Sequence, residues 1–88
     1  MQAEQRKRMA LSDSDLRDID RVLLDYLAEG RVTPVYARER IVDESHRDDV
    51  TSAYLGQRLK RLVEHGHADN LYDVGLYQIV TDPREKND

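Results

Sequence analysis

The hydrophobic pattern of the chain changes its period once, at Gly66, and this change limits the fold more than any other feature of the sequence. Before Gly66, apolar residues recur every three or four positions, which is the spacing of helices with one buried face. After Gly66 they alternate with polar residues, which is the spacing of strands. A chain of 88 residues is too short for two independent cores. The sequence therefore predicts one α+β domain in which helices precede a β-hairpin.

The first helix is predicted over residues 13–28. Ser12 is its predicted N-cap, with Asp15 three positions later, because acidic side chains are favoured near the positive end of the helix dipole. Gly30 is the predicted stop, since glycine is common just after the last helical residue. The apolar stripe of this helix consists of Leu16, Ile19, Leu23, Tyr26 and Leu27.

The second and third helices are predicted over residues 34–42 and 51–65, separated by a polar turn at 43–49. Thr33-Pro34 predicts the start of the second helix, because threonine caps helices and proline loses no hydrogen bond at the first helical position. The third helix is expected to bury Leu55, Leu59 and Leu62. Its opposite face carries Ala53, Tyr54, Gln57, Lys60, Arg61 and Glu64.

Two strands are predicted over residues 68–73 and 76–80, joined by a very short tip. Residues 1–11 show no periodicity and include three consecutive basic residues, so we interpret them as a flexible N-terminal arm. Residues 83–88 are predicted to be a flexible C-terminal tail. The folded domain is therefore expected to span residues 12–82.

A helix pair with a short link, a third helix and a terminal hairpin together form the arrangement of a winged helix-turn-helix, with the hairpin as the wing. In that architecture the last helix enters the major groove of DNA and the preceding helix crosses the backbone. Gln57 can bond the edge of adenine, and Arg58 or Arg61 can bond guanine or phosphate. Ser52 and Tyr54 are candidates for phosphate or base contacts.

Four segments between residues 16 and 84 carry motifs, namely Gly30-Arg31-Val32-Thr33-Pro34, Tyr54-Leu55-Gly56-Gln57-Arg58-Leu59-Lys60-Arg61-Leu62-Val63-Glu64-His65-Gly66, Gly75-Leu76-Tyr77 and Asp82-Pro83-Arg84. Together they resemble haloarchaeal winged helix-turn-helix transcription regulators of the phage-repressor type and, more loosely, the MarR and ArsR families. The resemblance implies sequence-specific binding of double-stranded DNA by a homodimer. It implies contacts from Ser52, Ala53, Tyr54, Gln57, Arg58 and Arg61. Lys60 on the same helix, and Thr33, Tyr36 and Arg40 around the second helix, complete the candidate DNA-binding set.

The charge composition is unusual. Acidic residues outnumber Lys and Arg 18 to 14, and Arg outnumbers Lys 11 to 3. This balance is typical of proteins from halophilic archaea, where molar salt screens the repulsion between carboxylates; the alternative is a merely acidic small protein. A net charge of −4 gives little long-range attraction to DNA, so binding would depend on a local basic patch and on base contacts.

Two features depart from the regulators that the chain resembles. The link between the second and third helices, residues 43–50, is several residues longer than a tight turn and carries four carboxylates that would repel phosphate. The tip Asp73-Val74-Gly75 is short and acidic. We therefore predict a structural wing that does not enter the minor groove.

A second hypothesis is that the same fold serves as a protein-interaction module that reads no DNA. The distribution of charge distinguishes the two hypotheses. A continuous basic stripe through Arg58, Lys60, Arg61 and Arg40 favours DNA, whereas carboxylates interleaved across that face favour a protein partner.

Several other classes of function are not expected. Without cysteine there is no disulfide or thiolate site, and His65 and His67 lack further ligands, so we predict no metal. No nucleophile with its base and no glycine-rich phosphate loop is visible, so we predict neither catalysis, nor a cofactor, nor a small-molecule substrate. No apolar stretch is long enough for a membrane span or a signal peptide, which predicts a cytoplasmic protein.

Overall fold

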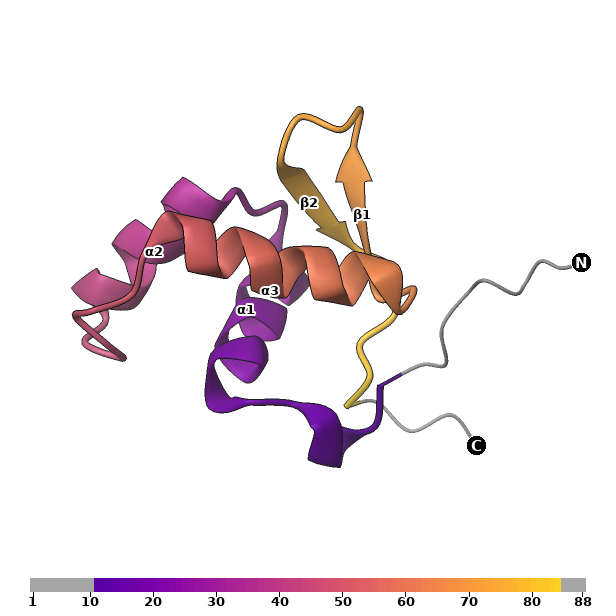
Figure 1. Cartoon of the computed structure of the whole chain (residues 1–88), viewed down its shortest axis with the longest axis horizontal. Coiled ribbons are helices and arrows are strands. Elements are labelled where there is room, and N and C mark those ends of the chain that lie inside the picture. Colours follow the sequence, from indigo (N-terminus) through magenta and orange to yellow (C-terminus); the bar gives the residue numbers. More distant parts are fainter. Residues whose placement is uncertain (1–10, 85–88) are drawn as a thin grey trace, which may run out of the picture.

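The computed structural model describes residues 11–84, and its elements follow the predicted order. They are η1 (a turn of 3₁₀ helix, Asp13–Asp15), α1 (Asp18–Glu29), α2 (Pro34–Asp43), α3 (Ser52–Glu64), β1 (Ala68–Leu71) and β2 (Leu76–Ile79). In Figure 1, α3 crosses in front of α1, α2 lies beside the N-terminal half of α3, and the hairpin rises above its C-terminal half. This α+β layout, three helices followed by an antiparallel hairpin, is consistent with a winged helix.

The first helical region is broken in two, whereas the sequence predicts one continuous helix. Ser12 does act as a cap, but for η1 alone: its backbone N–H donates to Asp15 Oδ2 at 2.9 Å. Arg17 is then extended (φ −87°, ψ 165°), and its N–H donates to Asp20 Oδ2 at 2.9 Å. The predicted helix start is therefore wrong, because Asp20 rather than Ser12 organises the first turn of α1, which begins at Asp18.

The start of α2 is confirmed. Thr33 Oγ1 accepts the N–H of Tyr36 at 3.0 Å, and Pro34 occupies the first helical position. Just before this cap, Val32 forms an antiparallel bridge with Tyr77 of β2, through N–H to O distances of 2.9 and 2.7 Å. The bridge ties the link between α1 and α2 to the hairpin, so the wing is anchored on the helical layer.

The two strands pair antiparallel, with Asn70 opposite Tyr77. β1 is shorter than the predicted range 68–73 because residues 72–75 form the connecting turn, and β2 ends at Ile79, one residue before the end of the predicted range 76–80. Tyr77 is buried, and its ring faces the core that the helices complete. The hairpin therefore serves as one wall of the core.

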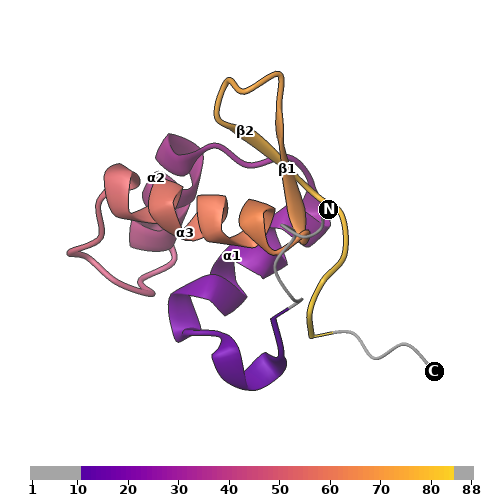
Figure 2. The ribbon, with the colours of Figure 1, turned by 45° about the vertical axis from the view of Figure 1, so that its right-hand side comes forward.

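The core is built almost entirely from aliphatic side chains. Figure 2 shows α1 below α3, with the hairpin above both. The apolar side chains that are no more than 1% exposed are Leu23, Leu24, Leu27, Val32, Ala37, Ile41, Leu55, Leu59 and Leu62. The predicted buried stripe of the third helix is therefore confirmed. Leucine dominates this set, and the sequence contains no Phe or Trp.

The described chain begins with a buried residue. Leu11, the last residue of the predicted arm, is 7% exposed, and its N–H donates to His67 Nε2 at 3.0 Å. The other ring nitrogen of His67 lies 2.9 Å from the carbonyl oxygen of Thr81. Because Nε2 accepts, the ring proton sits on Nδ1, where it donates to Thr81. Residues 1–10 of the arm and 85–88 of the tail lie outside the described residues.

Arg84 fastens the C-terminal segment to α1. Its guanidinium donates to Asp82 (Nη2 to Oδ2, 2.8 Å) and to Asp25 (Nη1 to Oδ1, 2.8 Å). Asp82 is only 11% exposed at its side chain. The hydrogen bond from Arg84 holds the pKa of Asp82 below its usual range, against the opposing effect of burial.

Acid is expected to destabilise the fold through this pair. Since the pKa of Asp82 is lower in the folded than in the unfolded chain, the unfolded chain binds the proton first. The contribution is fully present above the ordinary aspartate value of about 4 and is lost as the pH falls through the lower folded pKa. Urea unfolding between pH 7 and pH 2 at constant ionic strength measures this loss. Arg84→Gln should flatten the acid limb, and an unchanged limb in that variant would contradict the assignment.

Candidate nucleic-acid interface

The third helix begins and ends where the sequence predicts. Thr51 Oγ1 accepts the N–H of Tyr54 at 3.1 Å, which caps the first turn. Val50 is buried just before this cap. At the other end, His65 is the C-terminal cap and Gly66 follows with φ 82°, a left-handed conformation that suits glycine. Both ends of the candidate reading helix are therefore set by local sequence.

The outward stripe of α3 is formed by side chains spaced along one face of the helix. Ala53, Gln57, Lys60 and Glu64 are exposed and follow one another at intervals of four, three and four residues. The flanking candidates Ser52, Tyr54 and Arg61 are half-buried. The structure thus brings together six of the seven candidate residues predicted on this helix, either on the outward stripe or at its margins.

The seventh, Arg58, is turned towards α1. Its Nε donates to Asp20 Oδ1 at 2.8 Å and its Nη2 to Asp20 Oδ2 at 2.6 Å. The side chain of Arg58 is 12% exposed and that of Asp20 is 2% exposed. The hydrogen bonds with Asp20 raise the pKa of Arg58, so the guanidinium stays charged. The guanidinium of Arg58 is therefore hydrogen-bonded within the protein and faces α1 instead of the outward stripe.

Asp20 is a functional candidate that the sequence analysis missed. A signal was present, since Asp20 falls in the apolar stripe of α1, between Ile19 and Leu23. A carboxylate in such a stripe is buried on folding and requires a partner. Nothing in the local sequence identifies Arg58, which lies 38 residues further along, as that partner.

Arg40, predicted as a DNA contact from the second helix, is also engaged within the protein. Its guanidinium lies 4.1 Å from the ring centroid of Tyr26 and donates to Glu29 and, at 2.6 Å, to Glu44. It also donates to the hydroxyl of Tyr36 at 3.0 Å. Hydrogen bonds from Arg40 lower the pKa of both glutamates. This network links the ends of α1 and α2.

Arg61 lies at the margin of the outward stripe, near the N-terminal segment. Its Nε is buried and has no hydrogen-bond partner. Arg61 adds a favourable charge interaction with Asp15, whose pKa is lowered mainly by hydrogen bonds from Ser12. The guanidinium of Arg61 therefore lies close enough to η1 to interact with Asp15, and Arg61 remains a candidate for a DNA contact at the margin of the outward stripe.

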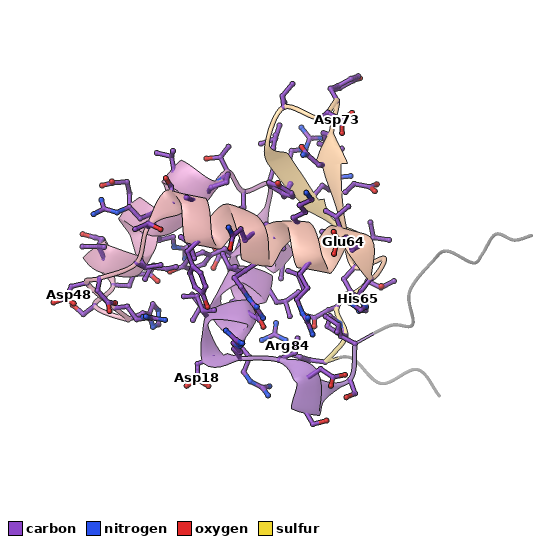
Figure 3. All side chains as sticks on the ribbon, viewed as in Figure 1. Asp18, Asp48, Glu64, His65, Asp73 and Arg84 are labelled. Atoms are coloured by element: carbon purple, nitrogen blue, oxygen red, sulfur yellow. The ribbon has the colours of Figure 1, made fainter. Side chains whose placement is uncertain are left out.

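Carboxylates stand around the two ends of α3. Figure 3 shows Asp48 at the connection before α3, Glu64 near its C-terminal end and Asp73 at the hairpin tip. In the connection, Arg47 donates to Asp49 at 3.2 Å, so its charge is shared with a neighbouring acid. A continuous basic stripe is therefore absent from the described face, because Arg58 and Arg40 are paired and acids flank the rest.

The tip of the wing holds side chains in an uncommon backbone conformation. Tyr72 and Asp73 have φ of 54° and 57°, which is costly for residues with a Cβ, and Gly75 has φ 79°. The Asn70 side chain accepts the N–H of Gly75 at 2.7 Å and closes the turn. Tyr72 is 95% exposed. The predicted acidic tip is present, and it carries an aromatic side chain beside the acid.

Metal-binding clusters and membrane-spanning helices are both absent from the described residues. Between Leu11 and Arg84, no three His, Asp or Glu side chains gather closely enough to hold a metal ion. No helix of this part of the chain is both long and apolar enough to cross a bilayer. One open hollow on the described surface is lined by Glu29, Arg31 and Gln78.

No protein-family model, curated protein or solved structure matches the chain. The winged-helix layout is therefore supported by the order and packing of the elements described above.

Proposed function

We propose that the protein is a sequence-specific DNA-binding transcription regulator that places α3 in the major groove. The observation that carries this proposal is the composition of the outward stripe. Ala53, Gln57 and Lys60 are exposed, and no carboxylate occurs in α3 before Glu64. The first turns of a recognition helix are the part that contacts base edges, so the acid-free part of α3 is the part that would enter the groove.

The side chains of the outward stripe are suited to recognising base edges more than to electrostatic attraction of phosphate. The amide of Gln57 can donate to N7 and accept from the N6 amino group of adenine, or reach a neighbouring phosphate. Lys60 supplies a flexible point charge for phosphate, and Tyr54 and Ser52 supply hydroxyl donors near the start of the helix. Ala53 is small and leaves room for a thymine methyl group.

The charge of the whole chain is compatible with this role at high salt. With a net charge of −4, long-range attraction to DNA is weak, and molar salt would screen most of what remains. Affinity would then depend on hydrogen bonds, apolar contacts and shape. We propose that the protein works in the cytoplasm of a halophilic archaeon, where its carboxylates are screened.

A homodimer would extend the site. Two copies related by a two-fold axis would place their third helices about 34–36 Å apart, facing successive major grooves. The operator would then be a palindrome with half-sites one helical turn apart. Light scattering after gel filtration in molar salt tests the state of assembly, and a monomer both free and on DNA would exclude the dimer.

Replacing Gln57 or Arg61 by alanine is expected to weaken binding by about 1–3 kcal/mol, the value of one base contact. The DNA site is first selected from a random pool with the wild-type protein, and affinities are then compared by mobility shift at matched salt. Gln78→Ala on β2 is the control, because it removes the same side chain outside α3. Wild-type affinity in both α3 variants would remove this helix from the interface.

A second candidate function is a winged-helix protein-interaction module. The observation that favours it is the pairing of Arg58 and Arg40 with acids, which interrupts the expected basic stripe through Arg58, Lys60, Arg61 and Arg40. Acidic groups at Glu64 and Asp73 would suit a basic partner. Immunoprecipitation of the protein from cells distinguishes the two functions: enriched DNA sites support the regulator, and a protein partner without enriched DNA supports the module.

A further inference from the structure

We propose that the buried pair of Asp20 and Arg58 sets the rotation of α3 about its own axis, and so decides which side chains α3 presents to DNA. This inference rests on the function proposed above. It makes Arg58 a positioning residue instead of a DNA contact. It also assigns a role to Asp20, which no motif in the sequence singles out.

The apolar contact between α1 and α3 is poorly directional by itself. Leucines dominate the buried side chains of both helices, with Leu23 and Leu27 on α1 and Leu55, Leu59 and Leu62 on α3, although α3 also packs against α2 and β1. Side chains of one shape pack almost equally well in several arrangements, so a uniformly leucine-rich contact leaves helix rotation under-specified. The aromatic side chains among the described buried residues are Tyr26 on α1 and Tyr77 on β2, so no fully buried aromatic ring of α3 itself fixes its rotation.

The ion pair between Asp20 and Arg58 fixes the rotation of α3 that the apolar contacts leave open. Two parallel hydrogen bonds, of 2.8 and 2.6 Å, join the guanidinium of Arg58 to the carboxylate of Asp20. A bidentate pair of this kind admits a narrow range of orientations. Asp20 is itself fixed, because Oδ2 also accepts the N–H of Arg17 at the start of α1. One carboxylate therefore ties the start of α1 to the middle of α3.

Rotation of α3 is coupled directly to the proposed reading face. Successive residues of a helix are about 100° apart around its axis. With Arg58 held towards α1, Gln57, the residue before it, is turned out to solvent. Lys60, two positions after Arg58, is exposed as well. Release of Arg58 would let α3 roll and carry Gln57 towards the margin of the face.

A role in selecting one packing arrangement also explains why a charged pair occupies a position where apolar side chains would fit. Taking two charges out of water is costly, so a buried ion pair adds little net stability compared with well-packed apolar residues. Its documented use is to select one arrangement among several. Asp20 at 2% exposure and Arg58 at 12% exposure meet the conditions for that use.

The test removes both charges together, with Asp20→Asn and Arg58→Met in one variant. Asparagine keeps an oxygen that can accept the N–H of Arg17, and methionine fills the space of the arginine stem. We expect a folded variant whose affinity for the selected DNA falls about tenfold or more, comparable to one lost base contact. We also expect the NMR amide signals of α3 to broaden or double, because several rotations become populated.

The matched control is Asp82→Asn with Arg84→Met, which removes an ion pair of the same charges outside α3. Its DNA affinity and its α3 signals should equal those of the wild type. Loss of affinity in this control as well would show that removing any ion pair is sufficient, and would overturn the proposal.

Salt dependence separates positioning from direct contact. If Arg58 touched a phosphate, its loss would reduce the slope of log K against log salt by about 0.9. If Arg58 only positions α3, the double variant keeps Lys60, whose flexible stem can still reach a phosphate after a small roll, so the slope should stay unchanged. Arg58→Lys keeps the charge and loses the bidentate fork, so it should weaken binding if Arg58 positions α3 and preserve binding if Arg58 contacts phosphate.

The proposal is overturned if the folded double variant keeps wild-type affinity and sharp α3 signals. It is also overturned by a reduced salt slope, or by full binding of Arg58→Lys. If the double variant does not fold, the DNA affinity and the α3 amide signals of the single Arg58→Lys variant test the proposal instead. If the wild type selects no DNA, the proposed function fails, while the NMR signals of α3 still decide whether the pair sets its rotation.

Discussion

Replacing Asp20 alone by alanine is expected to lower the free energy of unfolding by about 3–5 kcal/mol, because it leaves the Arg58 guanidinium buried without its partner. The same change removes the acceptor for the N–H of Arg17 at the start of α1. For a domain of this size the loss is a large fraction of the about 5–15 kcal/mol that separates folded from unfolded chains.

Urea unfolding at fixed salt and neutral pH measures this effect. The control is Asp18→Ala, which removes an exposed carboxylate from the same first turn of α1. Its only expected effect is a weaker interaction with the helix dipole, worth about 0.3–1 kcal/mol. Equal losses in the two variants would show that the pair with Arg58 contributes nothing special.

The double variant described above sharpens the comparison. Removing Asp20 and Arg58 together eliminates the uncompensated charge, so the double variant should be more stable than Asp20→Ala. A double variant as unstable as the single one would mean that the attraction between the two side chains, rather than the penalty of an orphaned charge, dominates.

Replacing Leu59 by alanine is expected to cost about 2–5 kcal/mol. Leu59 is 0% exposed and lies in the centre of the apolar stripe of α3. The cost has two parts, the lost transfer of the isobutyl group and the cavity left behind. Tyr26 and Tyr77 are the aromatic side chains among the described buried residues. Few large side chains are therefore present that could shift to fill the cavity.

The neighbouring substitution Lys60→Ala is the control for Leu59. Lys60 is exposed, and lysine and alanine differ little in helix propensity, so the free energy of unfolding should change by less than about 0.5 kcal/mol. The DNA affinity of Lys60→Ala should nevertheless fall if α3 binds DNA. Equal melting temperatures for Leu59→Ala and the wild type would contradict the described core.

The elements that local rules specify were predicted well. The caps at Thr33 and Thr51 each satisfy a backbone N–H within their own turn, and both formed as expected. The buried stripe of Leu55, Leu59 and Leu62 follows from helical spacing alone. These signals act over four residues or fewer, so they can be read without knowing the fold.

The start of the first helix was predicted wrongly because this segment contains two local caps, and local rules alone do not decide which of them starts the long helix. Ser12 and Asp15 form a good local cap, and the structure uses it, but only for η1. The helix proper starts at Asp18, where Asp20 is held in place by Arg58. The cap that starts α1 joins Asp20 to the N–H of Arg17 three residues away, and the contact with Arg58, 38 positions along the chain, holds the same carboxylate.

By itself the sequence determined the order of the elements, the caps of α2 and α3, and the face of α3 that is buried, because hydrophobic spacing and capping are properties of neighbouring residues. Tertiary structure alone decided which arginines remain for a partner. Arg58 is paired with Asp20, and Arg40 is paired with Glu29 and Glu44. Lys60 and Gln57 remain exposed to solvent. The reason is that a guanidinium pairs with whichever carboxylate the fold brings within reach, and distance along the chain does not predict that meeting.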